Sequence, residues 1–266
     1  MVTPRGGREW AAAAVERGYR YTKRASVPGL PGIMFRAGDG LQVTDVVDAL
    51  AADVPFVAGS LQAQYAGDSS IPRVLVTDYV AIPLQRAVPN IVLLGKGLTM
   101  LRFAGIGFEG RERLSLEGDF DKTFTLYCPA GYERDALEIF TPNLMQLLMD
   151  TTGGCDVELV DDWMFVYSRP GFRRDASTLA AIAEATAFVR STVERQTSRY
   201  VDDRAPKIGA TVSPEEFEAR RGGVAAGGRR VKTKSTPLQK LVLIGSWVVF
   251  LAIAGYAVYE WLLPRL

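Results

Sequence analysis

The sequence contains no histidine and only two cysteines, and these absences exclude several kinds of chemistry. Without histidine there is no Ser-His-Asp or Cys-His catalysis, no histidine-ligated metal and no imidazole pH switch. Cys128 and Cys155 are too few for a disulfide framework or a four-ligand zinc site, so we interpret them as core thiols in a reducing compartment. We therefore expect no catalytic, cofactor-binding or metal-binding residues, although enzymes built on carboxylates, lysine or tyrosine stay open.

The chain also lacks a strong net charge, because 31 basic residues nearly balance 30 acidic ones. The balance is uneven: residues 1–200 carry 21 basic and 24 acidic side chains, whereas residues 201–266 carry 10 and 6. A nucleic-acid-binding domain would show its basic patch on the folded part, so we expect no nucleic-acid partner. Hydrophobic residues make up 48% of the chain and charged residues 23%, which is typical of a folded protein.

One long hydrophobic run lies near the end of the sequence. Leu241 to Tyr259 is nineteen residues without a charge, and at about 1.5 Å per residue a helix of this length covers a bilayer's hydrocarbon of roughly 30 Å. Fully buried core helices are the alternative, but they are usually shorter. We predict a single transmembrane helix over 241–263, with four aromatic residues as membrane-interface anchors: Trp247, Tyr256, Tyr259 and Trp261.

Charges flanking this run predict its orientation. Seven basic residues and no acidic one lie between Ala219 and Lys240: Arg220, Arg221, Arg229, Arg230, Lys232, Lys234 and Lys240. Beyond the run the sequence has only Glu260 and Arg265. Because Lys and Arg near a span mark its cytoplasmic side, we predict a tail anchor in the inner cell membrane with the N-terminal domain in the cytoplasm. The start of the sequence, Met1 to Arg24, has no signal-peptide pattern.

The basic flank also suggests contact with lipid. Each Lys or Arg near an anionic leaflet is worth about 1 kcal/mol. We predict that five of these residues contact the membrane surface: Arg229, Arg230, Lys232, Lys234 and Lys240. The alternative is that they only set topology.

We expect an α+β domain at 1–200, a flexible basic linker at 201–240 with a short helix near 214–221, and the span at 241–263. Expected strands, some marked by period-two alternation and some by continuous apolar runs, are 32–40, 56–65, 73–82, 90–97, 124–129, 155–160 and 163–168. Pro83 and Pro89 are expected to separate two of them. Residues 43–50 fit a strand or a helical turn.

Four helices are expected, at 8–18, at 132–140, from Pro142 behind Thr141, and from Asp175 to about 200. The fold predicted is an antiparallel sheet of six or seven strands covered on one face by the long C-terminal helix. A small barrel closed by that helix is the alternative architecture.

Two motifs could indicate a ligand-binding site, but we interpret both as ordinary loops or turns. Gly105, Gly107 and Gly110 stand in G-x-G-x-x-G order, but the residues after them look extended rather than helical, so we predict a loop and not a dinucleotide site. Asp161 and Asp162 could suggest a metal site, but with no other ligand in view we expect them to close a hairpin as a solvated turn.

Several stretches resemble a family of actinobacterial membrane-associated proteins of unknown function. They are WAAAAVERGYRYTKR, LPGIMFRAG, DVVDAL, PFVAGSLQAQY, VLVTDYVAIPL, LEGDFDKTFTLYCPAGYERDALEIFTPNLMQLLMD and VELVDDWMFVYS. The resemblance covers about residues 8–200. It implies a membrane tether and a mixed α+β domain, but no activity and no functional residues.

The leading hypothesis is a tail-anchored, non-enzymatic adaptor, scaffold or accessory subunit of a membrane protein complex. Its expected partners are the lipid bilayer and a membrane protein, with no cofactor and no small-molecule ligand identified. The alternative is an envelope- or lipid-related enzyme or a lipid-binding module that uses carboxylates, for which the candidates are Glu117, Asp119, Asp121, Asp161 and Asp162.

Overall fold

A computed structural model describes most of the first 205 residues and one later segment. The described residues are 7–27, 29–65, 73–97, 99–116, 118–198, 200–205 and 223–233. The predicted span 241–263 and the predicted helix near 214–221 lie outside them, as do Lys234, Lys240, Trp247, Tyr256, Tyr259 and Trp261. Among the described residues, no helix has the length and apolar character that crossing a membrane requires.

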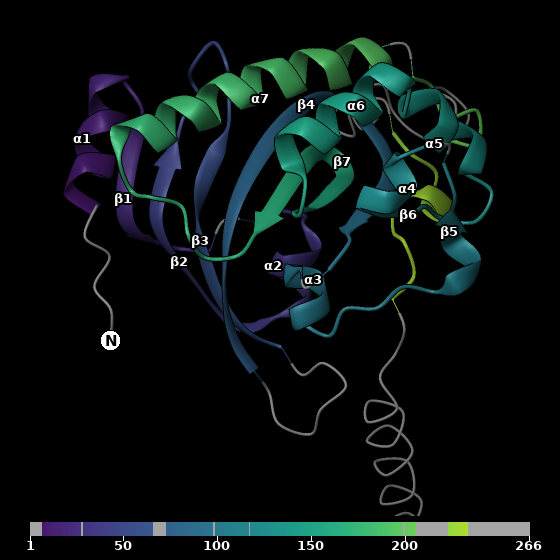
Figure 1. Ribbon diagram of the computed structural model, residues 1–266, viewed down its shortest axis with the longest axis horizontal. Helices are drawn as coiled ribbons and strands as arrows, with labels where there is room; N and C mark the ends of the chain where they lie inside the picture. The colour runs from purple at the N-terminus through teal and green to yellow at the C-terminus, as the bar shows by residue number, and fades with distance from the viewer. Residues whose placement is uncertain are drawn as a thin grey trace, which may run out of the picture.

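Seven antiparallel strands form one open sheet in the described part of the chain (Figure 1). They are β1 (Arg20–Ala25), β2 (Asp39–Asp48), β3 (Val57–Tyr65), β4 (Arg73–Gly95), β5 (Arg113–Leu114), β6 (Phe124–Tyr127) and β7 (Asp156–Ser168). The order is β1-β2-β3-β4-β6-β5, and β7 pairs with the other edge of β4. The central strand is therefore β4, whose first half pairs with β3 and whose second half pairs with β6.

Helices cover both faces of this sheet. They are α1 (Gly7–Glu16), α2 (Ile33–Ala37), α3 (Met100–Phe103), α4 (Phe120–Thr123), α5 (Glu133–Ile139), α6 (Pro142–Thr152) and α7 (Ala176–Thr197), with the short 3-10 turns η1 (Gly110–Glu112) and η2 (Ala226–Gly228). The long helix α7 lies across one face beside α1 and α6, and α2 and α3 lie on the opposite side (Figure 1). The domain thus has a helical layer on each side of the sheet.

Alternation along the strands builds two cores. Val80 and Ile82 of β4 belong to the core under α7, whereas Tyr79 and Ala81 belong to the core that contains α2 and α3. Successive side chains of a strand point to opposite faces, so one strand supplies both cores. A strand buried on both faces needs a layer on each side, which explains why the long apolar run of β4 lies in the middle of the molecule.

The predicted α+β class, the antiparallel sheet and the covering C-terminal helix are confirmed. Helix α7 begins behind Asp175, whose carboxylate accepts a hydrogen bond from the Thr178 N–H (2.8 Å). Leu179, Val189 and Val193 form its buried face. Helices α1, α5 and α6 also lie where the sequence predicted them, and residues 43–48, which fitted either state, belong to strand β2.

Residues 32–40 were predicted to be a strand, and this prediction is wrong for 33–37, which form helix α2. Three consecutive residues of α2 are buried, Ile33, Met34 and Phe35, so their run of apolar side chains does not reflect alternation in a sheet. The N–H of Ile33 donates to the buried carboxylate of Glu158 (2.7 Å), a partner 125 residues away. The helical conformation of 33–37 is therefore supported by a contact between residues far apart in the sequence.

The predicted breaks at Pro83, Pro89 and Asp161-Asp162 are also wrong, because β4 and β7 each continue through them. The two strands are irregular at the same place: the register shifts between Pro83 and Val88 and again before Ile91, and Val88 faces Asp161. Asp161 has a positive φ of 52°, a conformation that aspartate tolerates better than most residues. Proline is accepted within strands at such irregularities because no ladder hydrogen bond is lost there.

Gly32, which precedes α2, provides a test of the packing on this face. A Cβ at this position would lie 2.2 Å from Tyr167 Oη and 3.1 Å from the Phe165 ring. We expect Gly32→Ala to lower the free energy of unfolding by about 1–3 kcal/mol through overpacking, as measured by urea unfolding of the full chain in mild detergent. Gly29→Ala is the matched control, because a Cβ there meets nothing within 4 Å. Equal stability of the two variants would contradict this packing.

Candidate functional site

Residues 223–233, which we call the docked segment, lie against the folded domain at the end of the sheet that holds β5 and β6 (Figure 1). Thr233 forms an antiparallel bridge with Phe108, and the Lys232 carbonyl accepts from the Glu109 N–H (3.2 Å). Val224 and Val231 are only 5% and 6% exposed. This part of the stretch 201–240, which the sequence predicted to be a flexible linker, is therefore integrated into the domain.

Buried polar side chains hold the docked segment. Three of them accept hydrogen bonds from its backbone N–H groups: Asn90 Oδ1 from Val231 (2.8 Å), Glu112 Oε2 from Lys232 (2.6 Å) and Asp202 Oδ2 from Ala225 (2.9 Å). These acceptors are 2%, 3% and 3% exposed. A buried polar group that loses its partner costs about 1–3 kcal/mol, so undocking would leave several costly groups behind.

Tyr132 forms the other contact of the docked segment. A Cβ on Gly228 would lie 2.4 Å from the Tyr132 ring, so the backbone can approach the ring only because residue 228 is glycine. The Tyr132 hydroxyl donates to Asp202 Oδ2 (2.8 Å), and the Arg204 guanidinium lies 3.9 Å from the ring centroid. Burial, then the hydrogen bond to Asp202, raises the pKa of Tyr132 to about 12. The hydroxyl is thus a stable donor at neutral pH.

The basic residues predicted to contact lipid have different roles within the docked segment. Arg230 forms a two-pronged ion pair with Asp161, Nη1 to Oδ1 at 2.8 Å and Nη2 to Oδ2 at 2.9 Å. Arg229 is exposed and donates from Nε to the Val224 carbonyl (3.0 Å). The side chain of Lys232 is exposed. The charge of Arg230 is therefore neutralised within the domain, whereas Arg229 and Lys232 face solvent.

The candidate catalytic carboxylates do not gather into one site. Asp119 pairs with Lys122 (2.6 Å), and Asp121 accepts from the Leu116 N–H (3.0 Å) and from the Ser115 hydroxyl. Asp161 pairs with Arg230, Asp162 follows it in β7, and Glu117 lies outside the described residues. Among the described residues, no group of three or more cysteine, aspartate and glutamate side chains is placed to hold a metal ion.

A buried carboxylate that the sequence analysis missed lies under α2. Glu158 of β7 is fully buried and accepts from the Ile33 N–H (2.7 Å) and the Tyr167 hydroxyl (2.9 Å). Asn90 Nδ2 also donates to it (3.3 Å), and Arg36 Nη2 lies 3.8 Å away. Burial raises the pKa of Glu158, and these donors partly oppose the rise. Because Asn90 also accepts from Val231, this network connects α2, the sheet and the docked segment.

A second buried ion pair lies on the α7 side of the sheet. Arg174 Nη2 and Asp78 Oδ1 are 2.7 Å apart, and both side chains are almost fully buried. The guanidinium lies over the rings of Trp10 and Phe172, 5.2 Å and 5.6 Å from their centroids. Asp78 Oδ2 also accepts from the N–H groups of residues 171 and 172 (2.8 Å each). This pair fixes the chain that leads from β7 into α7.

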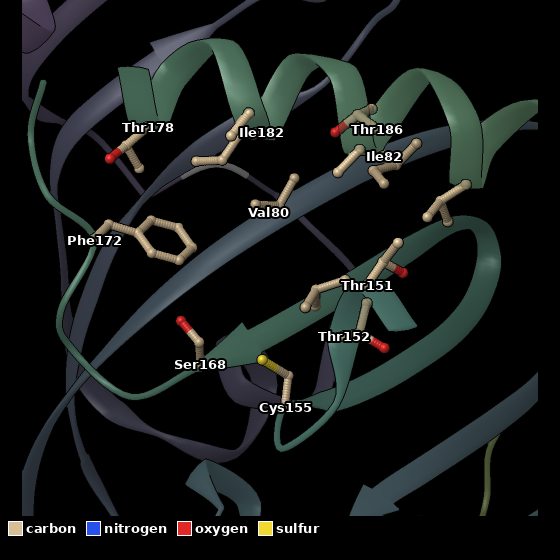
Figure 2. A pocket seen from close by; sticks show the side chains of 14 residues that line it. Val80, Ile82, Thr151, Thr152, Cys155, Ser168, Phe172, Thr178, Ile182 and Thr186 are labelled. Carbon is tan, nitrogen blue, oxygen red and sulfur yellow. The ribbon is translucent and has the colours of Figure 1, made fainter. Parts of the chain in front are cut away.

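A cavity of about 280 Å³ lies next to this pair, between α7 and the sheet. Figure 2 shows that Val80 and Ile82 of β4 lie beneath it, that Ile182 and Thr186 of α7 lie above it, and that Cys155 lies at its lower end. Phe172 closes another side. The sequence predicted that this helix covers the sheet, but it did not indicate a cavity beneath the helix.

Both thiols are protonated at neutral pH. Burial raises the pKa of Cys155 to about 11 and that of Cys128 to about 12, and nearby acidic side chains add to both shifts. The thiolate is the nucleophilic form, so neither cysteine is activated for catalysis. Cys128 is buried and Cys155, in the cavity wall, is half-buried, so the prediction of two core thiols holds in full only for Cys128.

The fold and these sites define an open antiparallel α+β domain with a docked C-terminal segment and an apolar cavity. Compared with protein families and with curated proteins, the chain shows no significant match. Among solved structures, it is similar to the mycobacterial trehalose monomycolate transport factor A, with a TM-score of 0.47 and 14% identity over 72% of this chain and 93% of that one.

Asp156, at the start of β7, is expected to make stability depend on pH. Its buried carboxylate accepts from the N–H groups of Gly95 (3.0 Å) and Leu101 (2.8 Å), but desolvation raises its pKa from 3.8 to about 6. A raised pKa means that the folded state holds the proton more tightly, so this contribution to stability is present at low pH and is lost as pH rises through about 6.

We expect the difference in free energy of unfolding between the unsubstituted protein and Asp156→Asn to fall by about 2 kcal/mol from about pH 4.5 to about pH 7.5. The asparagine variant keeps every other titrating group, so it serves as the control at each pH. Urea unfolding followed by tryptophan fluorescence measures both proteins. Parallel pH profiles would show that Asp156 does not titrate in this range.

Proposed function

We propose that this protein is a membrane-anchored, non-enzymatic accessory protein whose domain is held at the inner face of the cell membrane by its docked segment. The observation that carries the proposal is the attachment of residues 223–233 to buried acceptors of the domain, immediately before the hydrophobic run. A segment bound this firmly transmits the position of an anchor to the whole domain. Its partners would be the bilayer and a membrane protein.

Docking shortens the connection to the proposed span. From Thr233 to Leu241 there are eight residue steps, which span at most about 29 Å when fully extended. A flexible linker over the whole of 201–240 could extend to roughly 140 Å by the same measure. The docked segment would therefore keep the β5–β6 end of the sheet near the membrane and restrict which partners the domain can reach.

The basic residues fit a division of roles. Arg230 is paired with Asp161, so its charge supports docking. Arg229 and Lys232 are exposed, and together with Lys234 and Lys240 they would face anionic lipid at about 1 kcal/mol each. The absence of acidic residues from this stretch supports the cytoplasmic orientation.

A binding role is favoured over catalysis by the state of the reactive groups. The described candidate carboxylates Asp119, Asp121, Asp161 and Asp162 all interact with other groups, and both thiols are protonated at neutral pH. Glu158 and Asp156 are buried among structural hydrogen bonds. These groups support the fold more directly than they support a reaction.

Membrane attachment is tested by fractionation of cells that express the full chain or a chain ending at Thr233. We expect the full chain to stay in the membrane pellet after carbonate washing, because a run of nineteen apolar residues is long enough to span the bilayer. The shortened chain keeps the docked segment and should appear in the soluble fraction. Release of the full chain by carbonate would refute the anchor. Mass spectrometry of proteins that comigrate with it, after mild extraction, then tests for a membrane partner.

Docking is tested by trypsin, which cleaves after Arg229, Arg230 and Lys232. We expect Val231→Asp to release the segment, because an unpaired carboxylate would have to be buried at a position only 6% exposed. Cleavage at the three sites, followed by mass spectrometry, should then accelerate at least about tenfold, which corresponds to a loss of 1.4 kcal/mol in docking. Val201→Asp is the matched control, because Val201 is 66% exposed. Similar cleavage rates in the two variants would show that the segment is not docked.

A further inference from the structure

The walls of the cavity under α7 carry no charge. The residues around it are aliphatic, aromatic or hydroxyl-bearing, with one thiol that is protonated at neutral pH. Arg174, whose guanidinium lies over the Phe172 ring, pairs with Asp78 and is not among the residues that line the cavity. A charged ligand group inside this cavity would lose its hydration without gaining a partner, so the walls favour an uncharged, apolar ligand.

Helix α7 contributes small side chains to these walls. Ala181, Ala185 and Thr178 face the cavity together with Ile182 and Thr186. Residues three and four positions apart lie on one helix face, so this spacing leaves a shallow channel along α7 rather than a filled core. The small side chains of α7 therefore leave space above the sheet.

The hydroxyl groups of α6 do not make the cavity polar. The Thr151 hydroxyl donates to the Leu147 carbonyl (2.7 Å), and the Thr152 hydroxyl donates to the Leu148 carbonyl (2.7 Å). Because each hydroxyl is satisfied within its own helix, neither needs a hydrogen bond from a ligand. Opposite them, Val80, Ile82 and Val166 present a floor of branched aliphatic side chains.

From these walls and this size we infer that the cavity binds a single unbranched aliphatic chain of about ten carbons, such as an acyl chain. An engineered cavity of about 150 Å³ binds benzene, which has six carbon atoms, so a cavity of about 280 Å³ has room for roughly ten or eleven. Its volume lies at the small end of ligand pockets, so the cavity has room for one such chain and not for several. The inference does not depend on the membrane anchor.

Cys155 provides the readout, because it is half-buried in the wall while the other thiol, Cys128, is buried. Cys128→Ala makes it the single thiol of the full chain. The protein is kept in CHAPS, a detergent with a steroid body and no alkyl chain, and the rate of Cys155 alkylation by N-ethylmaleimide is followed by intact mass. The probes are 1-decanol, decanoic acid and the compact cage alcohol 1-adamantanemethanol.

We expect 1-decanol at about four times its Kd to slow Cys155 alkylation about fivefold, because only the unoccupied fraction reacts. The cage alcohol should leave the rate nearly unchanged. Equal protection by decanoic acid would show that its carboxylate stays outside the cavity. Weaker protection by the acid would show that an uncharged chain end enters it, and both results support a chain site. An unchanged rate with decanol, or equal protection by the cage alcohol, would overturn the inference.

A blocking variant separates binding in the cavity from a general effect of the alcohol. Ala185→Phe places a ring in the cavity wall and should abolish protection by decanol. Ser191→Phe adds the same ring on α7 at an exposed position outside the cavity and should retain protection. Should the phenylalanine at 185 disturb folding, as seen by circular dichroism, Ala185→Leu replaces it with a smaller obstruction. If decanol still protects Cys155 in a folded variant at residue 185, the inference is overturned. This outcome is independent of the membrane fractionation of the full chain.

Discussion

The fold is built around the pairing of β4 with β7. These are the two longest described strands. Strand β4 pairs with β3 and β6 along one edge and with β7 along the other. Their side chains are buried on both faces, so the pair is stable only when a layer covers each side. Helix α7 with α1 and α6 provides one layer, and α2 and α3, with Val231 of the docked segment, provide the other. The cavity lies under the first of these layers, and the docked segment contributes to the second.

Long-range hydrogen bonds make the second layer specific. Asn90 accepts a hydrogen bond from the N–H of Val231, which is 141 residues away in the sequence. Glu158 accepts one from the N–H of Ile33, which is 125 residues away. Apolar contact alone would allow a covering segment to shift, but a buried acceptor must be matched by a donor at one position. The bulge at Asp161 adds an ion pair to Arg230 at the same end. The docked segment is therefore placed in one register, which the proposed connection to an anchor would need.

The docked segment and the cavity depend on different physical properties. The docked segment depends on buried polar groups that are fully partnered, whereas the cavity depends on small uncharged side chains along α7. An aliphatic ligand would be suited to a domain held near a bilayer, but each property stands without the other. A protein with both would hold an apolar chain close to a membrane.

Period and capping are local signals, and they predicted the α+β class, the helices α1, α5, α6 and α7, the strands β3 and β6 and the first half of β4. Contacts in the folded domain were needed to show that 33–37 is helical, that β4 continues through Pro83 and Pro89, and that 223–233 docks. The cavity and the buried hydrogen-bond acceptors could likewise not be predicted from the sequence. Each of these depends on partners far away in sequence, such as Glu158 for α2 and Asn90 for the docked segment, and local pattern carries no information about contacts of that range.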